Sequence, residues 1–191
     1  GLSHSEITPV SLPLAETTSL LVSAGDSASL NEFYALLLRQ LSELQDASVL
    51  LCSSTLSLDS ARVVREPEQL NNVLDEFAEE LKARRSAHKA DSSLRFSPIV
   101  IVVDGLASVI QRAEQKAIAR LEVFIRLGEG IGVTVIGADT AQNVELAYYS
   151  QNILMETLHE GPLLLTGGSA ADHRITDVQT LSKQFPGKFA P

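Results

Sequence analysis

Residues 23–32, SAGDSASLNE, are small and polar and separate a strand-like segment from a helix-like one. Residues 18–23 are mostly apolar, and further apolar residues then recur at helical spacing at Phe33, Leu36, Leu37 and Leu41. A strand, a small-residue loop and a helix form the setting of the G-x-x-x-x-G-K-[ST] loop, in which backbone N–H groups and a Lys bind phosphate. Residues 24–31 are therefore a candidate phosphate-binding loop.

The residue that neutralises phosphate is missing from this stretch. If Ala24 or Gly25 opens the motif, its Gly-Lys-Ser end falls on residues 29–31 or 30–32, and neither set contains a Lys. The degenerate positions are Ala24, Gly25, Asp26, Ser27, Ala28, Ser29, Leu30 and Asn31. Because Asp26 and Glu32 would repel phosphate, we interpret the start of the stretch as a tight polar turn.

A second candidate residue, Asp104, ends another strand-like run. Residues 99–103 are all β-branched, which is typical of a strand covered on both faces. An Asp after such a strand holds Mg²⁺ in phosphate-loop NTPases. An Asp at this place also commonly caps a helix or a turn, so the pattern alone leaves both interpretations open. In either case the buried carboxylate needs hydrogen-bond partners, and we expect it to bind the loop or a neighbouring helix terminus, without a metal ion.

Alternating strands and helices position these residues. We predict strands over 18–23, 49–52, 99–103, 133–138 and 162–166. A Ser-rich loop over 53–60 leads to a helix over about 67–85, a polar linker covers 88–97, and a second long helix carries Ala117, Leu121, Phe124 and Leu127 on its buried face. Such alternation predicts a single α/β domain of 191 residues with a mainly parallel sheet.

Composition argues against several classes of function. The net charge is −9 and residues 1–38 contain no Lys or Arg, which disfavours nucleic acid as a partner. The basic cluster of Lys82, Arg84, Arg85, His88 and Lys89 closes a predicted helix, where cations favour the helix dipole. The single Cys52 is expected to be a buried thiol, and the four scattered His residues predict no metal site. No apolar run is long enough to span a membrane.

The order of these motifs resembles the FtsK/SpoIIIE group of RecA-like motor ATPases. It is most similar to the last, third, ATPase domain of the membrane-anchored ATPases of type VII secretion, called EssC in Firmicutes and EccC in actinobacteria. Residues 1–2 with 8–10 and Leu12 are similar to the lead-in of these domains, residues 20–31 to their Walker A region and residues 99–104 to Walker B. Residues 130–138 resemble a glycine-rich strand of the family, and Gly167, Gly168, Asp172 and His173 its "GG…DH" pattern.

The resemblance implies a RecA-like P-loop NTPase fold with helices on both faces of the sheet and strand order 5-1-4-3-2. It also implies that residues 1–191 are one degenerate ATPase domain, a fragment of a larger protein that begins here without a Met. Hydrolytic members usually carry a second acid where this chain has Gly105, which leaves the attacking water unpositioned. We therefore expect no catalytic residue and no cofactor in this domain, and a structural role for His173.

Partners follow from the same resemblance. They are the preceding ATPase domains of the same chain and small helical secreted proteins of the WXG and LXG type, within a possible hexamer on the cytoplasmic side of the bacterial cell membrane. Contact with the membrane is expected only through the parent chain. The connection after the fourth predicted strand is unusually apolar, and its candidate partner-binding residues are Tyr148, Tyr149, Ile153, Leu154 and Met155. The simpler interpretation is that this segment only covers the sheet.

Two other functions stay open at this point. In one, the domain binds and hydrolyses ATP with Mg²⁺, and the missing cation comes from Arg112, Arg174 or a neighbouring domain. In the other, the chain is an α/β interaction domain or hydrolase unrelated to NTPases, although it has no G-x-S-x-G nucleophile motif. Strand order and nucleotide binding separate these possibilities from a catalytically silent secretion domain.

Overall fold

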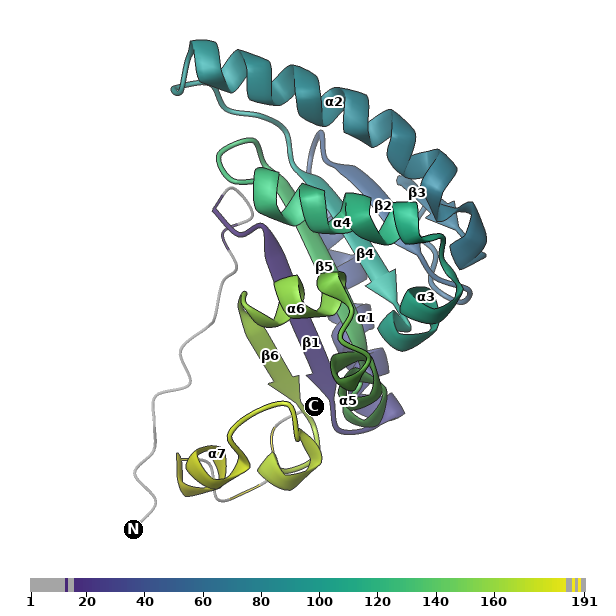
Figure 1. Cartoon of the computed structure of the whole chain (residues 1–191), viewed down its shortest axis with the longest axis vertical. Helices are drawn as coiled ribbons and strands as arrows, with labels where there is room; N and C mark the ends of the chain where they lie inside the picture. The colour runs from purple at the N-terminus through teal and green to yellow at the C-terminus, as the bar shows by residue number, and fades with distance from the viewer. Residues whose placement is uncertain (1–12, 14–15, 185–186, 188, 190–191) are drawn as a thin grey trace.

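A six-stranded, all-parallel sheet forms the centre of the computed structural model, which describes residues 13, 16–184, 187 and 189 (Figure 1). Its strands run in the order β3-β2-β4-β5-β1-β6. Their bounds are β1 Ser19–Ala24, β2 Ser48–Cys52, β3 Ala61–Val64, β4 Ile99–Asp104, β5 Val133–Thr140 and β6 Leu163–Thr166. Every pairing in the sheet is parallel, so the carboxyl ends of all six strands meet at one edge.

The predicted α/β class and strand order are confirmed, with one addition. The five predicted strands correspond to β1, β2, β4, β5 and β6, and they lie in the expected order 5-1-4-3-2. The sixth strand, β3, pairs with β2 at the sheet edge and was not predicted. It has only four residues, and Arg62 within it is exposed, so it lacks the apolar run that marks a central strand.

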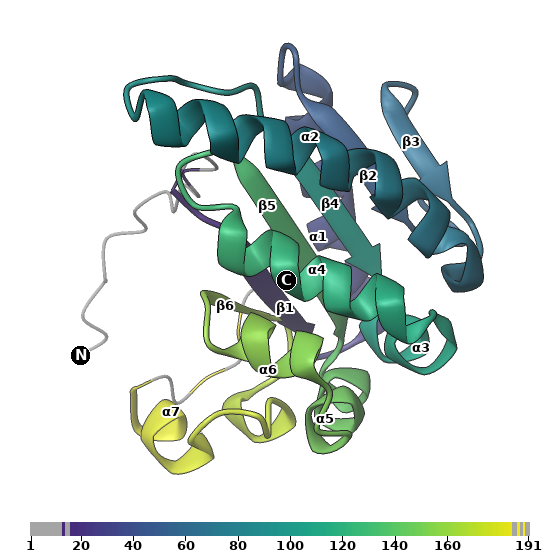
Figure 2. The same cartoon turned by 45° about the horizontal axis from the view of Figure 1, so that its top comes forward.

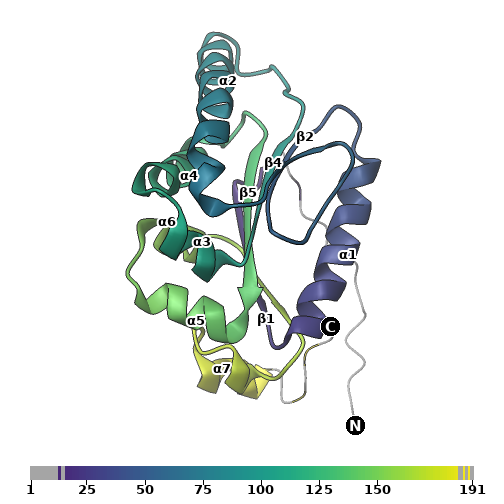
Figure 3. The ribbon, with the colours of Figure 1, turned by 90° about the vertical axis from the view of Figure 1, so that its right-hand side faces the viewer.

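Helices cover both faces of the sheet, but unequally (Figure 2 and Figure 3). Helix α1, Ser27–Glu43, lies alone on one face. The other face carries α2 Leu70–Ala90, α3 Leu106–Arg112, α4 Gln115–Leu127, α5 Ala141–Tyr149 and α6 Ile153–His159. Two 3₁₀ turns, η1 Pro67–Gln69 and η2 Ala170–Asp172, and helix α7 Val178–Gln184 complete the elements. None of the described helices has the length and apolar content that crossing a membrane requires.

One predicted helix boundary was wrong. Helix α2 continues to Ala90, into the segment predicted as a polar linker. Its last turns are held by tertiary contacts, because Arg84 donates hydrogen bonds to the carbonyl oxygens of Ser97 and Ile131 at 2.6 and 3.0 Å. The second predicted long helix corresponds to α4, which carries all four of its named apolar residues, whereas the short helix α3 before it was not predicted.

Two apolar layers hold the sheet between the helices. In β4, Ile101 and Val103 belong to the layer under α2 to α6, whereas Val100 and Val102 belong to the layer under α1. All four side chains are completely buried. This confirms the prediction of a strand covered on both faces and fixes Asp104 at the carboxyl edge.

Cys52 is expected to be unreactive in the native protein. The thiol is buried at the end of β2, and burial, with a smaller effect of the nearby Asp104 charge, raises its pKa to about 12. Because the thiolate is the nucleophile, alkylation by iodoacetamide at pH 8, followed by mass spectrometry, should be negligible in buffer and complete in urea. Similar alkylation rates with and without urea would show that this end of the sheet opens readily.

Candidate functional site

The turn from β1 to α1 consists of only two residues, Gly25 and Asp26. Asp26 is the N-cap of α1, and its carboxylate accepts a hydrogen bond from the Ser29 backbone N–H at 2.8 Å. Residues 27–31, which correspond to most of the candidate phosphate loop, already belong to the helix. The interpretation as a tight polar turn agrees with this geometry, and the segment lacks the wide backbone loop that encloses a phosphate.

A second turn, Gly167–Gly168, packs directly against Gly25. The Gly25 N–H donates to the carbonyl oxygen of Thr166 at 2.8 Å. A Cβ atom on Gly25 would lie 2.6 Å from the Gly168 nitrogen and 2.7 Å from the Gly167 carbonyl carbon, both of them backbone atoms. Both glycines of the second turn have positive φ, 62° and 67°, which favours glycine there. Protein backbone therefore lies directly against the β1–α1 turn.

Buried His173 holds the Gly167–Gly168 turn. Its Nε2 lies 3.0 Å from the Gly167 carbonyl oxygen, and its Nδ1 lies 2.8 Å from the Ser23 Oγ. Because a carbonyl can only accept, Nε2 donates to Gly167, while Nδ1 is hydrogen-bonded to the Ser23 hydroxyl. Asp172 closes a capping box with Ser169 in the same segment. The "GG…DH" residues thus connect the end of β6 to β1, as the structural role predicted for His173 requires.

Asp104 has a hydroxyl donor on each carboxylate oxygen. Tyr34 of α1 donates to Oδ1 at 2.6 Å, and Ser53, just after β2, donates to Oδ2 at 2.5 Å. Neither partner is the one expected, because Ser53 lies in the loop after β2 rather than in the candidate phosphate loop, and Tyr34 is a side chain within α1 rather than a helix terminus. Burial, and after it the Asp104 charge, raises the pKa of Tyr34, which keeps its proton in place as a donor. Both carboxylate oxygens of Asp104 are thus hydrogen-bonded to protein hydroxyl groups.

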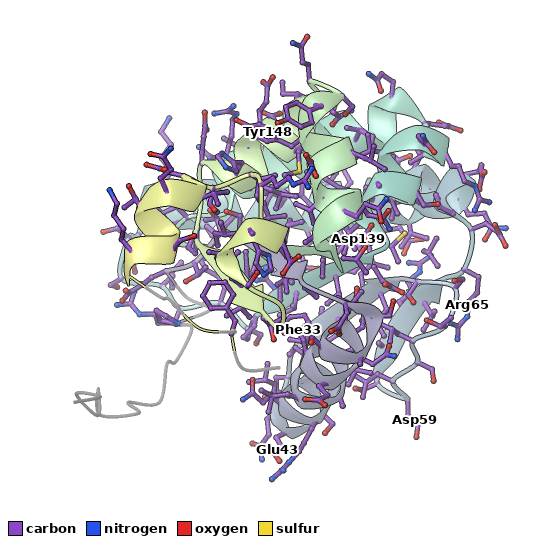
Figure 4. The ribbon with its side chains drawn as sticks, turned by 90° about the horizontal axis from the view of Figure 1, so that it is seen from below. Phe33, Glu43, Asp59, Arg65, Asp139 and Tyr148 are labelled. Carbon is purple, nitrogen blue, oxygen red and sulfur yellow. The ribbon has the colours of Figure 1, made fainter. Side chains whose placement is uncertain are left out.

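Asp139 is a buried carboxylate that the sequence analysis did not identify. It lies near the end of β5, 3% exposed, and Figure 4 shows it near the middle of the carboxyl edge. One oxygen accepts from the Ala107 N–H at 3.1 Å, and the other accepts from the Thr140 N–H and the Asn143 side chain, both at 2.8 Å. Burial raises its pKa, although these hydrogen bonds oppose the shift. Asp139 therefore supplies an acceptor to the start of α3, a capping role that we had considered for Asp104.

Two hollows open at this edge, each with one of the cations proposed as substitutes for the missing Lys. The hollow beside Asp104, of about 280 Å³, includes Arg112, which forms ion pairs with Glu66 and Glu68 at 2.6 and 3.0 Å. The hollow beside Gly25, of about 520 Å³, includes Arg174, whose Nη1 lies 3.8 Å from a Glu145 oxygen. Both cations therefore already lie close to carboxylates.

The five candidate partner-binding residues separate into two groups. Tyr148, Tyr149 and Ile153 are 36%, 67% and 46% exposed on α5 and α6. Leu154 and Met155 are completely buried in the core under these helices, where a partner does not reach them. Leu146, 62% exposed and one helical turn before Tyr149, was not predicted although it belongs to the same apolar stretch. We name Leu146, Tyr148, Tyr149 and Ile153 the α5–α6 patch.

The described residues contain no group of three or more His, Cys, Asp or Glu side chains placed to hold a metal ion. Asp104 and Asp139 are the two carboxylates at the centre of the edge, and both are already occupied by protein donors. The geometry therefore offers anchoring of loops and helix ends rather than a ready set of metal ligands.

Comparisons with known proteins identify relatives by structure. No protein-family model and no curated protein sequence matches the chain. EccC of Thermomonospora curvata (ATPases 2 and 3), solved in complex with a signal sequence peptide, is similar over 86% of this chain and 32% of its own, with a TM-score of 0.63 and 16% identity. The cytoplasmic domain of EssC is similar over 85% of this chain and 33% of its own, with a TM-score of 0.62 and 15% identity.

A third similar solved structure is a conjugation coupling protein. The pCW3 conjugation coupling protein TcpA, in its monomer form with ATPγS, matches 87% of this chain and 53% of its own, with a TM-score of 0.59 and 16% identity. The chain thus spans about a third of the length of the EccC and EssC structures. At these identities the comparison establishes the fold, and the chain has the fold found in EccC, EssC and TcpA.

Proposed function

We propose that this chain is a catalytically silent ATPase-fold domain of a type VII secretion motor, which recognises exported proteins or regulates their export. The observation that carries the proposal is the β1–α1 turn, where the Asp26 carboxylate caps α1 and the Gly167–Gly168 turn packs against Gly25. In an active phosphate-loop enzyme, phosphate itself binds at this helix N-terminus. The fold shared with EccC and EssC supports the assignment to a secretion motor.

Loss of hydrolysis follows from three features at the same edge. Asp26 places a negative charge where a phosphate group would need positive charge. Leu30, at a position where the motif carries Lys in one register, is 9% exposed and packs in the apolar layer under α1. Gly105 follows Asp104 with φ of 68° and has no side chain to position water. In the full-length protein, we propose, preceding ATPase domains supply hydrolysis within a hexamer at the cytoplasmic side of the membrane.

An active ATPase remains the second candidate, because Arg174 and Gly25 line the same hollow. In that case Arg174 would leave Glu145 and bind phosphate, with Mg²⁺ held at Asp104 after Tyr34 and Ser53 release it. These rearrangements break at least two hydrogen bonds to a carboxylate, each worth about 1.5–3 kcal/mol. The silent domain needs no rearrangement and is the better supported of the two.

The chain is expected to bind Mg·ATP weakly or not at all. Calorimetric titration of the purified chain should give no saturable heat with Mg·ATP or Mg·ADP, because the helix N-terminus is capped by Asp26. Arg174→Ala is the matched variant, since it removes the cation that lines the hollow beside Gly25 without changing the cap. Micromolar affinity that Arg174→Ala abolishes would establish the second candidate function instead.

Restoring the Lys alone is not expected to restore hydrolysis. Leu30→Lys places the new side chain against the apolar layer under α1 and leaves Gly105 unchanged, so we expect lower stability and no phosphate release. Asn31→Lys is the control for the other motif register, because Asn31 is exposed on the first turns of α1 and tolerates a Lys. Measurable turnover in either variant, absent from the starting protein, would contradict this expectation.

The α5–α6 patch is the proposed docking surface for an export signal. Signal peptides of the small helical WXG and LXG proteins are the proposed ligands, and the solved EccC complex contains a signal sequence peptide. Exposed tyrosines present a large, rigid contact area and are suited to anchor such a segment. Tyr148 also packs against Tyr149 and His159, with ring centroids 5.7 and 4.8 Å apart, so the patch is a defined surface.

Tyr149→Ala is expected to weaken binding of an export-signal peptide at least tenfold and to leave the fold intact. Fluorescence anisotropy measures the affinity, and circular dichroism with urea unfolding monitors the fold. Leu36→Ala is the matched control, because Leu36 is an apolar residue of similar exposure, 55%, on α1 at the opposite face of the sheet. Equal affinity of the two variants and the starting protein would place peptide docking elsewhere.

A further inference from the structure

A separate apolar trough is lined by residues of α2 and α4. Figure 1 shows α4 between α2 on one side and α6 on the other. Its volume is about 310 Å³. Leu81 and Phe124 form part of its floor and belong to the core, whereas Val123 is 39% exposed beside them. The remaining apolar lining residues are Ala78, Ala119 and Leu127. The trough is therefore a continuation of the core that opens to the surface.

Four cations and no carboxylate line this trough, although Glu79 and Asp75 lie beside it and pair with two of the cations. Lys82 and Arg85 come from α2, and Lys116 and Arg120 come from α4. These are four of the 15 basic residues of a chain whose net charge is −9. The chain contains more acidic than basic residues, whereas the charged residues that line the trough are all basic. The charge of the lining is therefore opposite in sign to the net charge of the protein.

Internal contacts orient three of the cations without neutralising all of them. Lys82 pairs with Glu79 at 2.5 Å, and Arg120 pairs with Asp75. Arg85 donates to the Leu127 carbonyl oxygen at 3.1 Å, which fixes the guanidinium at one end of the trough. Lys116 is exposed at the first turn of α4. Positive charge thus lies on both walls of an apolar floor.

We propose that the α2–α4 trough binds an acidic, amphipathic helical segment of a protein partner. Two helices that border an apolar trough accept the apolar ridge of a third helix. Acidic residues on both sides of that ridge would then meet Lys82 and Arg85 on one wall and Lys116 and Arg120 on the other. A phosphate backbone would match the cations but not the apolar floor, and a second copy of this chain would need an acidic helix face opposite its own trough.

The probe for this proposal is a designed peptide rather than a natural partner. It has about 18 residues, long enough to form a helix on binding, with Leu at positions i, i+3, i+4 and i+7 and Glu at the flanking positions. A matched peptide carries Lys in place of every Glu. By fluorescence anisotropy, the acidic peptide is expected to bind the chain at least tenfold more tightly than the basic peptide. Its affinity should fall as salt is raised, because the rim charges are exposed to solvent.

Two variants locate the binding surface. Val123→Asp puts a negative charge on the exposed edge of the floor, and Lys116→Glu reverses the charge of one cation at the rim. Each variant should lower the affinity for the acidic peptide at least tenfold. Leu36→Asp, on the opposite face of the sheet, is the matched control and should bind normally. Tyr149→Ala should also bind this probe normally, which distinguishes the trough from the proposed signal-docking patch. Urea unfolding of each variant shows that it is folded.

Three results would overturn the proposal. The first is equal binding of the acidic and basic peptides, or no binding of either. The second is unchanged affinity in Val123→Asp and Lys116→Glu. The third is a dimer in sedimentation that Val123→Asp converts to a monomer, which would assign the trough to a second copy of the chain.

Discussion

The N-terminus of α1 imposes the constraint on which the rest of this edge depends. The first N–H groups of a helix have no partner within the helix, and together with the helix dipole they attract an anion. In this chain the Asp26 carboxylate meets that need at 2.8 Å from the Ser29 nitrogen. A side-chain cap of this kind stabilises a helix by about 1 kcal/mol. Because the cap belongs to the chain itself, its local concentration does not depend on any ligand. Any phosphate would have to displace it and then overcome its charge.

Other polar side chains along this edge are also hydrogen-bonded to protein groups. Asp104, at the position that resembles a magnesium-binding acid, accepts hydroxyl hydrogens from Tyr34 and Ser53. Asp139 accepts hydrogen bonds from the starts of α3 and α5. His173 ties the Gly167–Gly168 turn to Ser23 of β1. These contacts connect helices, strands and turns at the carboxyl edge, which supports the structural role that we propose for it.

Much of the fold was predictable because it depends on local patterns. The β-branched run of residues 99–103 identifies a central strand, and alternating strands and helices predict a parallel sheet. The order of the strands was implied by the resemblance to RecA-like ATPases and is confirmed. Strand β3 and the last turns of α2 were not predictable in this way. Their stability comes from pairing with β2 and from the contacts of Arg84 with Ser97 and Ile131, which are tertiary.

The positions of the candidate site residues in the fold were predictable from the sequence, but their hydrogen-bond partners were predictable only in part. The missing Lys is visible in the sequence, but the two-residue length of the β1–α1 turn and its contact with Gly167 and Gly168 are not. Tyr34 and Ser53 come from segments far from Asp104 in sequence, so no spacing rule pairs them with it. The connection after β5 was identified as apolar, but its candidate partner-binding residues differ in burial. Leu154 and Met155 lie in the core, while Tyr149 is exposed. Asp139 directly follows the predicted strand over residues 133–138, and the sequence analysis overlooked this signal.

The central claim is that the N-terminus of α1 is closed to phosphate by its own cap. The most direct measurement is a two-dimensional ¹H–¹⁵N NMR titration that follows the backbone amides of Gly25, Ser29 and Leu30 while Mg·ATP, and separately pyrophosphate, is raised into the millimolar range. If the cap excludes phosphate, these amide signals are expected to keep their chemical shifts, with only the small, non-saturating drift that ionic strength produces in exposed amides. Saturable shifts of the three amides would show that phosphate reaches the helix N-terminus, and would contradict the silent-domain account.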